Sequence, residues 1–220
     1  MVVNTCKLKV IYMPRKRTIF QKITFVIFSL FGLIIIFFVM SALFRAFGFS
    51  ENIMLIIFVS ILIGSFIDIP LFTKKWIYEG AISRTFSTKV CLNVGGALIP
   101  MGLSIYLLYN HTELLKSFFI AVLVIAVIVR IVSRAVPNKG FTIPLFIPPV
   151  VTIFVVWYLP GTSVVLAFAS GVFGVLLGLD IMNINRIKKL NAAKVTFGGA
   201  GTFDAVFITG LASLFVHFML

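Results

Sequence analysis

Apolar stretches of about 20 residues recur along this chain, separated by short and mostly basic segments. A helix of about 20 apolar residues is long enough to cross the hydrocarbon core of a bilayer. Hydrophobic residues make up 61% of the chain and charged residues 11%, which is too few to cover a water-exposed surface. We therefore predict an all-α polytopic membrane helix bundle with about seven transmembrane helices. The predicted spans are residues 23–44, 53–72, 90–109, 117–136, 141–159, 163–183 and 197–220.

The 19 Lys and Arg residues predict how these spans are oriented. Cytoplasmic loops of membrane proteins carry an excess of Lys and Arg. With the N-terminus in the cytoplasm and the C-terminus outside, only Arg45 and Lys116 lie on the outer side. We predict a basic cytoplasmic N-terminal segment, residues 1–22, and a single transmembrane domain, residues 23–220. The net charge of +13 is scattered over short loops, which indicates anionic lipids of the cell membrane, not nucleic acid, as partners.

The fifth predicted span is unusual because three prolines, Pro144, Pro148 and Pro149, lie in its first half. Each proline removes a backbone donor and clashes with the preceding helical turn. We expect a broken fifth helix.

Three of the six acidic residues, Asp68, Asp180 and Asp204, lie within or at the ends of predicted spans. A carboxylate in hydrocarbon is costly, so such residues mark candidate functional sites. The predicted orientation places all three in the cytoplasmic half of the membrane. Asp204 lies near the start of its helix, where the helix dipole favours a negative charge, whereas Asp68 and Asp180 lie near helix C-termini. We expect the latter two to need a partner, and Arg130 and Arg134 in the fourth span supply candidate charges.

The same half of the membrane contains small and polar residues at predicted helix starts. They are candidates to line a substrate-binding cavity that opens to the cytoplasm. These residues are Asn93, Gly95, Gly96, Pro144, Pro148, Gly199 and Gly201. The alternative interpretation of such small-residue stripes is close helix packing.

Four motifs resemble those of a prokaryotic multi-pass membrane family catalogued as domain of unknown function 1614. They are residues 93–100 (NVGGALIP), 143–149 (IPLFIPP), 178–180 (GLD) and 198–210 (GGAGTFDAVFITG). The resemblance covers roughly residues 53 to 220. It implies a shared fold and no particular activity.

A second pattern is similar to the intramembrane aspartyl proteases of the presenilin type. Those proteases carry one Asp in an inward-running helix and a second Asp after Gly-x-Gly in the next helix. Here Asp180 precedes a basic loop, and Gly199-Ala200-Gly201 precedes Asp204. This chain departs from the protease pattern because Thr202 and Phe203 separate the Gly-x-Gly from the Asp, and because no Pro-Ala-Leu element follows.

Three classes of function are consistent with these features. An intramembrane aspartyl hydrolase would use Asp180 and Asp204 as a catalytic pair on a membrane peptide. An ion- or proton-coupled transporter or channel would use intramembrane acids near broken helices to carry a small ion. In a non-catalytic assembly component, the polar positions would only hold helices together. We find no nucleotide-binding loop and no metal-binding motif, and we predict no cofactor and no metal.

Overall fold

The computed structural model describes residues 19–78, 84–137, 140–190 and 192–219, and within these ranges it leaves the side chains of some helix and strand residues undescribed. The chain forms two compact units, residues 1–38 and 39–220. Helix α1 (Ile19–Ala46) crosses the boundary between them. Within the first unit, the helix exposes large apolar side chains such as Ile27 and Phe28. Such a surface is suited to lipid.

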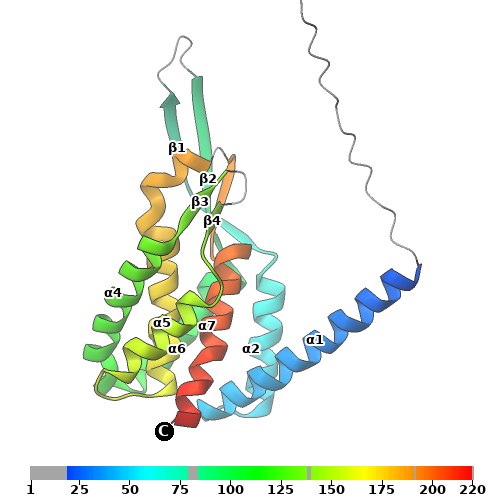
Figure 1. Ribbon diagram of the computed structural model, residues 1–220, viewed down its shortest axis with the longest axis vertical. Coiled ribbons are helices and arrows are strands. Elements are labelled where there is room, and N and C mark those ends of the chain that lie inside the picture. Colours follow the sequence, from blue (N-terminus) through cyan, green and yellow to red (C-terminus); the bar gives the residue numbers. More distant parts are fainter. Residues whose placement is uncertain (1–18, 79–83, 138–139, 191, 220) are drawn as a thin grey trace, which may run out of the picture. The chain divides into compact units, whose positions relative to one another are not determined.

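The second unit is a bundle of six α-helices in the described residues, with strands gathered at one end (Figure 1). The helices are α2 (Glu51–Gly64), α3 (Ile99–Tyr109), α4 (Leu115–Val132), α5 (Ile147–Trp157), α6 (Val164–Val175) and α7 (Ala200–Met219). Four further helical segments extend or connect them. These are η1 (Val94–Leu98), η2 (Thr112–Leu114), η3 (Leu176–Asp180) and η4 (Ile181–Leu190), of which η1 and η3 are π-helical and the other two are 3₁₀ helices.

The five described strands form two small sheets. Strands β1 (Asp68–Tyr78), β2 (Arg84–Asn93) and β5 (Lys194–Phe197) form one sheet in the order β1-β2-β5. Strand β2 is antiparallel to β1 and parallel to β5. Strands β3 (Arg134–Val136) and β4 (Gly140–Thr142) form an antiparallel pair. We call the end of the bundle that carries these strands the sheet end.

The predicted all-α class was therefore wrong in part, because two apolar stretches turn from helix to strand. The second predicted span, residues 53–72, is helical only to Gly64 and continues as β1 from Asp68. The third, residues 90–109, begins as the end of β2 and becomes helical at Val94. Mean hydropathy cannot separate a buried helix from an apolar strand. Pro70 disfavours a continuing helix, and the β-branched and aromatic residues that follow it favour a strand.

The predicted break of the fifth helix was also wrong. Helix α5 is continuous and begins only at Ile147, so Pro148 and Pro149 lie in its first turn. Backbone N–H groups in a first helical turn have no intrahelical partner, and proline is favoured there for that reason. Pro144 precedes the helix, and its carbonyl oxygen accepts a hydrogen bond from Ile147 N.

Three helices in the described residues are long and apolar enough to cross a membrane, judged by length and composition. They are Val26–Ala46, Thr112–Val132 and Val164–Lys188. Four shorter apolar helices accompany them: Glu51–Gly64, Val94–Tyr109, Ile147–Trp157 and Ala205–Val216. The chain thus has the helices of a membrane protein. The predicted seven crossings, and the orientation with the N-terminus in the cytoplasm, stay predictions.

Helix α6 forms the centre of the second unit and packs against α3, α4, α5 and α7. All of its side chains are buried except that of Phe173, which is half-buried. Its glycines allow close contact with neighbours, since a methyl group at Gly174 would overlap Ile125 of α4 and one at Gly171 would overlap Thr209 of α7. Helix α6, which lies in the sixth predicted span, is therefore enclosed by other helices.

Candidate functional site

The predicted site residues meet where the helices join the larger sheet. We call this region the junction and define it by Asp68, Asn93, Gly96, Asp180 and Gly198. It brings together the end of α2, the turn η1, the end of η3 and the turn before α7. Three of the four sequence motifs contribute to it.

Asn93 connects the sheet to the helices and is 5% exposed. Its amide nitrogen Nδ2 donates hydrogen bonds to Ser65 O at 2.8 Å and to Asp68 Oδ1 at 2.9 Å. Its oxygen Oδ1 accepts a hydrogen bond from Gly96 N at 2.7 Å and so caps the first turn of η1. Asn93 was predicted to bind substrate, but here its amide group is occupied by holding α2, β1 and η1 together.

Asp68 begins β1 and forms an ion pair with Lys194 of β5, with 2.6 Å between Oδ2 and Nζ. Thr196 Oγ1 donates a second, longer hydrogen bond to the same carboxyl oxygen at 3.4 Å. Burial alone would raise the pKa of Asp68, but the hydrogen bonds from Lys194 and Asn93 hold it below its ordinary value of 3.8. The hydrogen bond to Asp68 in turn raises the pKa of Lys194 above its ordinary value of 10.5.

We predicted Arg130 and Arg134 as candidate partners of Asp68 and Asp180. In the structure Asp68 pairs with Lys194 instead, and Arg130 has a different partner. Arg130 Nε donates a hydrogen bond to Met182 O at 2.9 Å. Arg134 lies in β3 with an exposed side chain. Lys194 and Thr196 were missed by the sequence interpretation. The alternation of polar and apolar residues along Lys194–Phe197 is the strand signal that could have revealed them.

The Asp68–Lys194 pair predicts how stability depends on pH. Because the folded-state pKa of Asp68 is lowered, its contribution is present above pH 3.8 and is lost as the pH falls through the lower, folded-state value. Because the pKa of Lys194 is raised, its contribution is present below pH 10.5 and is lost as the pH rises through the higher value. Replacing Asp68 with Asn should lower the free energy of unfolding by about 1 kcal/mol at neutral pH.

The test is unfolding of the wild type and of Asp68→Asn in detergent between about pH 2 and pH 7. The difference between the two free energies of unfolding should shrink at the acidic end. A difference that stays constant over this range would show that the carboxylate charge makes no contribution.

Asp180 connects the sixth and seventh predicted spans, and only 2% of it is exposed. Its carboxyl oxygen Oδ2 accepts a hydrogen bond from Gly198 N at 2.9 Å. Gly198 has a φ of +69°, which favours glycine, and a methyl group there would lie 2.7 Å from Ala97 Cβ. The carboxylate of Asp180, the turn η1 and the turn before α7 therefore meet at Gly198. We expected Asp180 to need a partner because it lies near a helix C-terminus, and the N–H of Gly198, just before another helix, donates a hydrogen bond to it.

Asp204 lies one helical turn after Ala200, in the first part of α7. Its side chain is outside the described residues, and the burial of Gly201, also in α7, is not described either. Gly199 is described, and its N–H donates a hydrogen bond to Thr196 O at 3.1 Å, which closes the turn between β5 and α7.

Gly95 packs directly on α2. A methyl group at this position would overlap Ile61 O and Ser65 N of the α2 backbone. The contact at Gly95 therefore supports close helix packing, which was the alternative to a role in substrate binding. Gly96 is buried and donates its N–H to Asn93.

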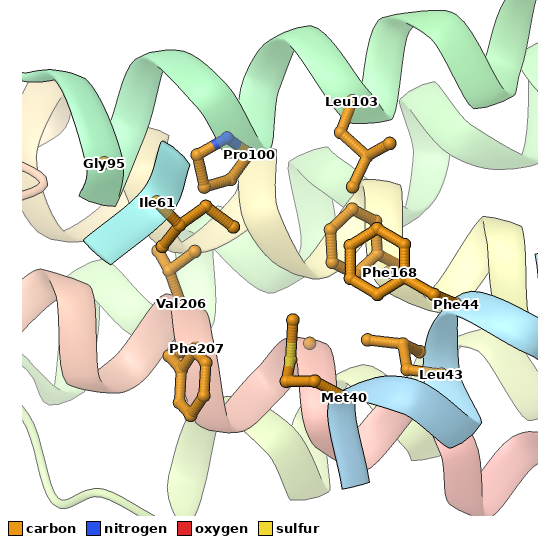
Figure 2. Close-up of a pocket in the computed structure, with 11 residues that line it drawn as sticks. Met40, Leu43, Phe44, Ile61, Gly95, Pro100, Leu103, Phe168, Val206 and Phe207 are labelled. Carbon is orange, nitrogen blue, oxygen red and sulfur yellow. The ribbon is translucent and has the colours of Figure 1, made fainter. Parts of the chain in front are cut away.

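A small apolar pocket adjoins the junction through Gly95 (Figure 2). Figure 2 shows side chains of α2, α3, α6 and α7, and of α1 from Met40 onward, around it. The lining residues are Met40, Leu43, Phe44, Ile61, Gly95, Pro100, Leu103, Phe168, Val206, Phe207 and Gly210. Such a pocket suits an apolar group and offers no polar side chain to a metal or cofactor.

The fold and the junction define a helical membrane protein with a small sheet at one end of its bundle. A family model described as "Protein of unknown function (DUF1614)" matches residues 62–216, so the chain belongs to this family. All four sequence motifs lie within the matched residues. Comparisons with curated proteins and with solved structures found no match. They lend no support to the similarity with presenilin-type proteases.

Proposed function

We propose that this protein is an intramembrane hydrolase of the aspartyl type, with Asp180 and Asp204 as its catalytic pair. The observation that supports this proposal is the hydrogen bond from Gly198 N to the buried carboxylate of Asp180. It holds Asp180 against the turn that leads into α7, and Asp204 belongs to the first part of that helix. This contact supports treating Asp180 and Asp204 as one catalytic pair.

The chemistry follows from the repulsion between two neighbouring carboxylates. Two such groups in a low-dielectric site share one proton, so one is ionised and the other is protonated. The carboxylate takes a proton from water as the water oxygen bonds to the peptide carbonyl carbon, and the protonated carboxyl donates its proton to the carbonyl oxygen. Transfer of a proton to the amide nitrogen then accompanies cleavage of the C–N bond, which yields a carboxylic acid and an amine.

The surroundings of the junction indicate the class of substrate. The adjoining pocket is lined by apolar side chains, and the helices around it expose apolar surface. A membrane-embedded peptide matches such a surface better than a soluble one. The transport alternative is less well supported, because Asp68, one of the acids it would use, lies on the sheet in an ion pair with Lys194.

The experiment uses the full chain in proteoliposomes with fluorescent helical membrane peptides as substrates. We expect cleavage by the wild type and a decrease of at least about 100-fold in Asp180→Asn and in Asp204→Asn. Glu113→Gln is the matched control, because Glu113 is an exposed acid beyond the end of α3, in η2. It should cleave like the wild type.

The same vesicles can be assayed for proton and ion flux. Cleavage that survives both aspartate substitutions would refute the catalytic pair. Flux that depends on Asp180, without any cleavage, would assign the site to transport instead.

A further inference from the structure

Two arginines lie at the sheet end, where the end of α4 meets η4. Arg130 is in the last turn of α4, where the membrane-length helix Thr112–Val132 ends. The hydrogen bond from its Nε to Met182 O, at 2.9 Å, holds the guanidinium group against η4. The remaining guanidinium N–H groups of Arg130 can donate to a ligand.

Arg186 follows Met182 by four residues in the same segment and is half-buried. The hydrogen bond from Arg130 to Met182 O brings the end of α4 against the segment that carries Arg186. None of the ion pairs in the described part of the chain involves either arginine. Two neighbouring guanidinium groups without a carboxylate between them attract an oxyanion.

The backbone around this pair is held in place by buried contacts. Asn183, which is fully buried, donates through Nδ2 to Ser133 Oγ at 2.9 Å and to Leu179 O at 2.8 Å. Ser133 Oγ donates to Arg130 O at 2.9 Å. Ile187 and Leu190 bury their side chains and anchor the far end of η4. The backbone that carries the two arginines is therefore held in place before any ligand binds, which lowers the entropic cost of binding.

The position along the helices identifies the source of the oxyanion. Arg130 terminates an apolar helix, so its guanidinium lies at the boundary of the hydrocarbon, the depth of the lipid headgroups. Next to it, Met182 and Ile181 expose apolar side chains that suit an acyl chain. We propose that Arg130 and Arg186 bind the phosphate group of an anionic phospholipid. This site is independent of the proposed hydrolase activity.

The test is calorimetric titration of the detergent-solubilised full chain with short-chain phosphatidylglycerol, phosphatidylcholine and inorganic phosphate, each separately. We expect phosphatidylglycerol to bind most tightly. Arg186→Gln should weaken it about fivefold, and the double variant Arg130→Gln with Arg186→Gln about 25-fold. Lys116→Gln, which removes an exposed charge from the start of α4, at the other end of the helix, is the matched control and should not change the affinity.

Arg130→Lys keeps the charge and removes the planar fork, so it should bind less tightly than the wild type while folding normally. Thermal unfolding of each variant checks that the fold is intact. An affinity for phosphatidylglycerol that stays within twofold in Arg186→Gln would overturn the proposal. Binding of inorganic phosphate as tight as that of the lipid would overturn the assignment to a headgroup.

Discussion

Replacing Asp180 with alanine should lower the free energy of unfolding by about 3 kcal/mol. The side chain is almost fully buried, and its carboxylate accepts the N–H of Gly198. Alanine would leave that N–H without this acceptor and would leave a cavity at the point where η3 meets the turn before α7. Unfolding in mixed detergent with increasing denaturant, followed by circular dichroism, measures the change.

The paired variant Asp180→Asn separates structure from catalysis. Asparagine has nearly the same volume and keeps an oxygen that can accept the hydrogen bond from Gly198, so the loss should be only about 1 kcal/mol. It removes the ionisable group, so a folded but inactive protein is the expected result. If Asp180→Ala is as stable as the wild type, the contact with Gly198 does not hold the junction together.

The second large effect is expected at Gly95. A methyl group at this position overlaps backbone atoms of Ile61 and Ser65, and backbone cannot move aside as a flexible side chain can. Gly95→Ala should therefore lower the free energy of unfolding by about 3 kcal/mol, through separation of η1 from α2. The cap formed by Asn93 and Gly96 lies beside this contact and should be disturbed with it.

Gly102 in α3 is the matched control, because a methyl group there meets no atom within 4 Å. Gly102→Ala should raise stability by about 0.5 to 1 kcal/mol, since alanine has the higher helix propensity. Equal effects of the two substitutions would mean that the contact between α2 and η1 does not limit the size of residue 95.

The apolar pattern predicted the interior of the bundle well. The sixth span lies at its centre, and the fourth, predicted over residues 117–136, is helical over Leu115–Val132. Both are apolar along their whole length and are flanked by polar residues, so hydropathy places them correctly. The pattern failed at the sheet end. Residues 68–72 were predicted as the end of a transmembrane helix, but they belong to β1 and pair with β2.

The site was only partly predicted. Its motifs can be recognised in the sequence, but the contacts between them cannot. Asn93, Gly96 and Asp180 were singled out, and the structure brings the segments that carry them together at Gly198. The partner of Asp68 could not be foreseen, because Lys194 lies 126 residues away and reaches it only through the parallel pairing of β5 with β2. Non-local strand pairing leaves little trace in a single sequence.

The three aspartates of this chain permit a direct test of the proposed pair, because selective ¹³C labelling of aspartate gives only three carboxyl signals. Asn substitutions assign each signal, and titration of the protein in detergent follows each carboxyl separately. If Asp180 and Asp204 form one site, Asp204→Asn should shift the titration midpoint of the Asp180 signal by about one pH unit or more, and Asp68→Asn should leave it unchanged. An Asp180 titration that is identical with and without the Asp204 carboxyl would contradict the pair.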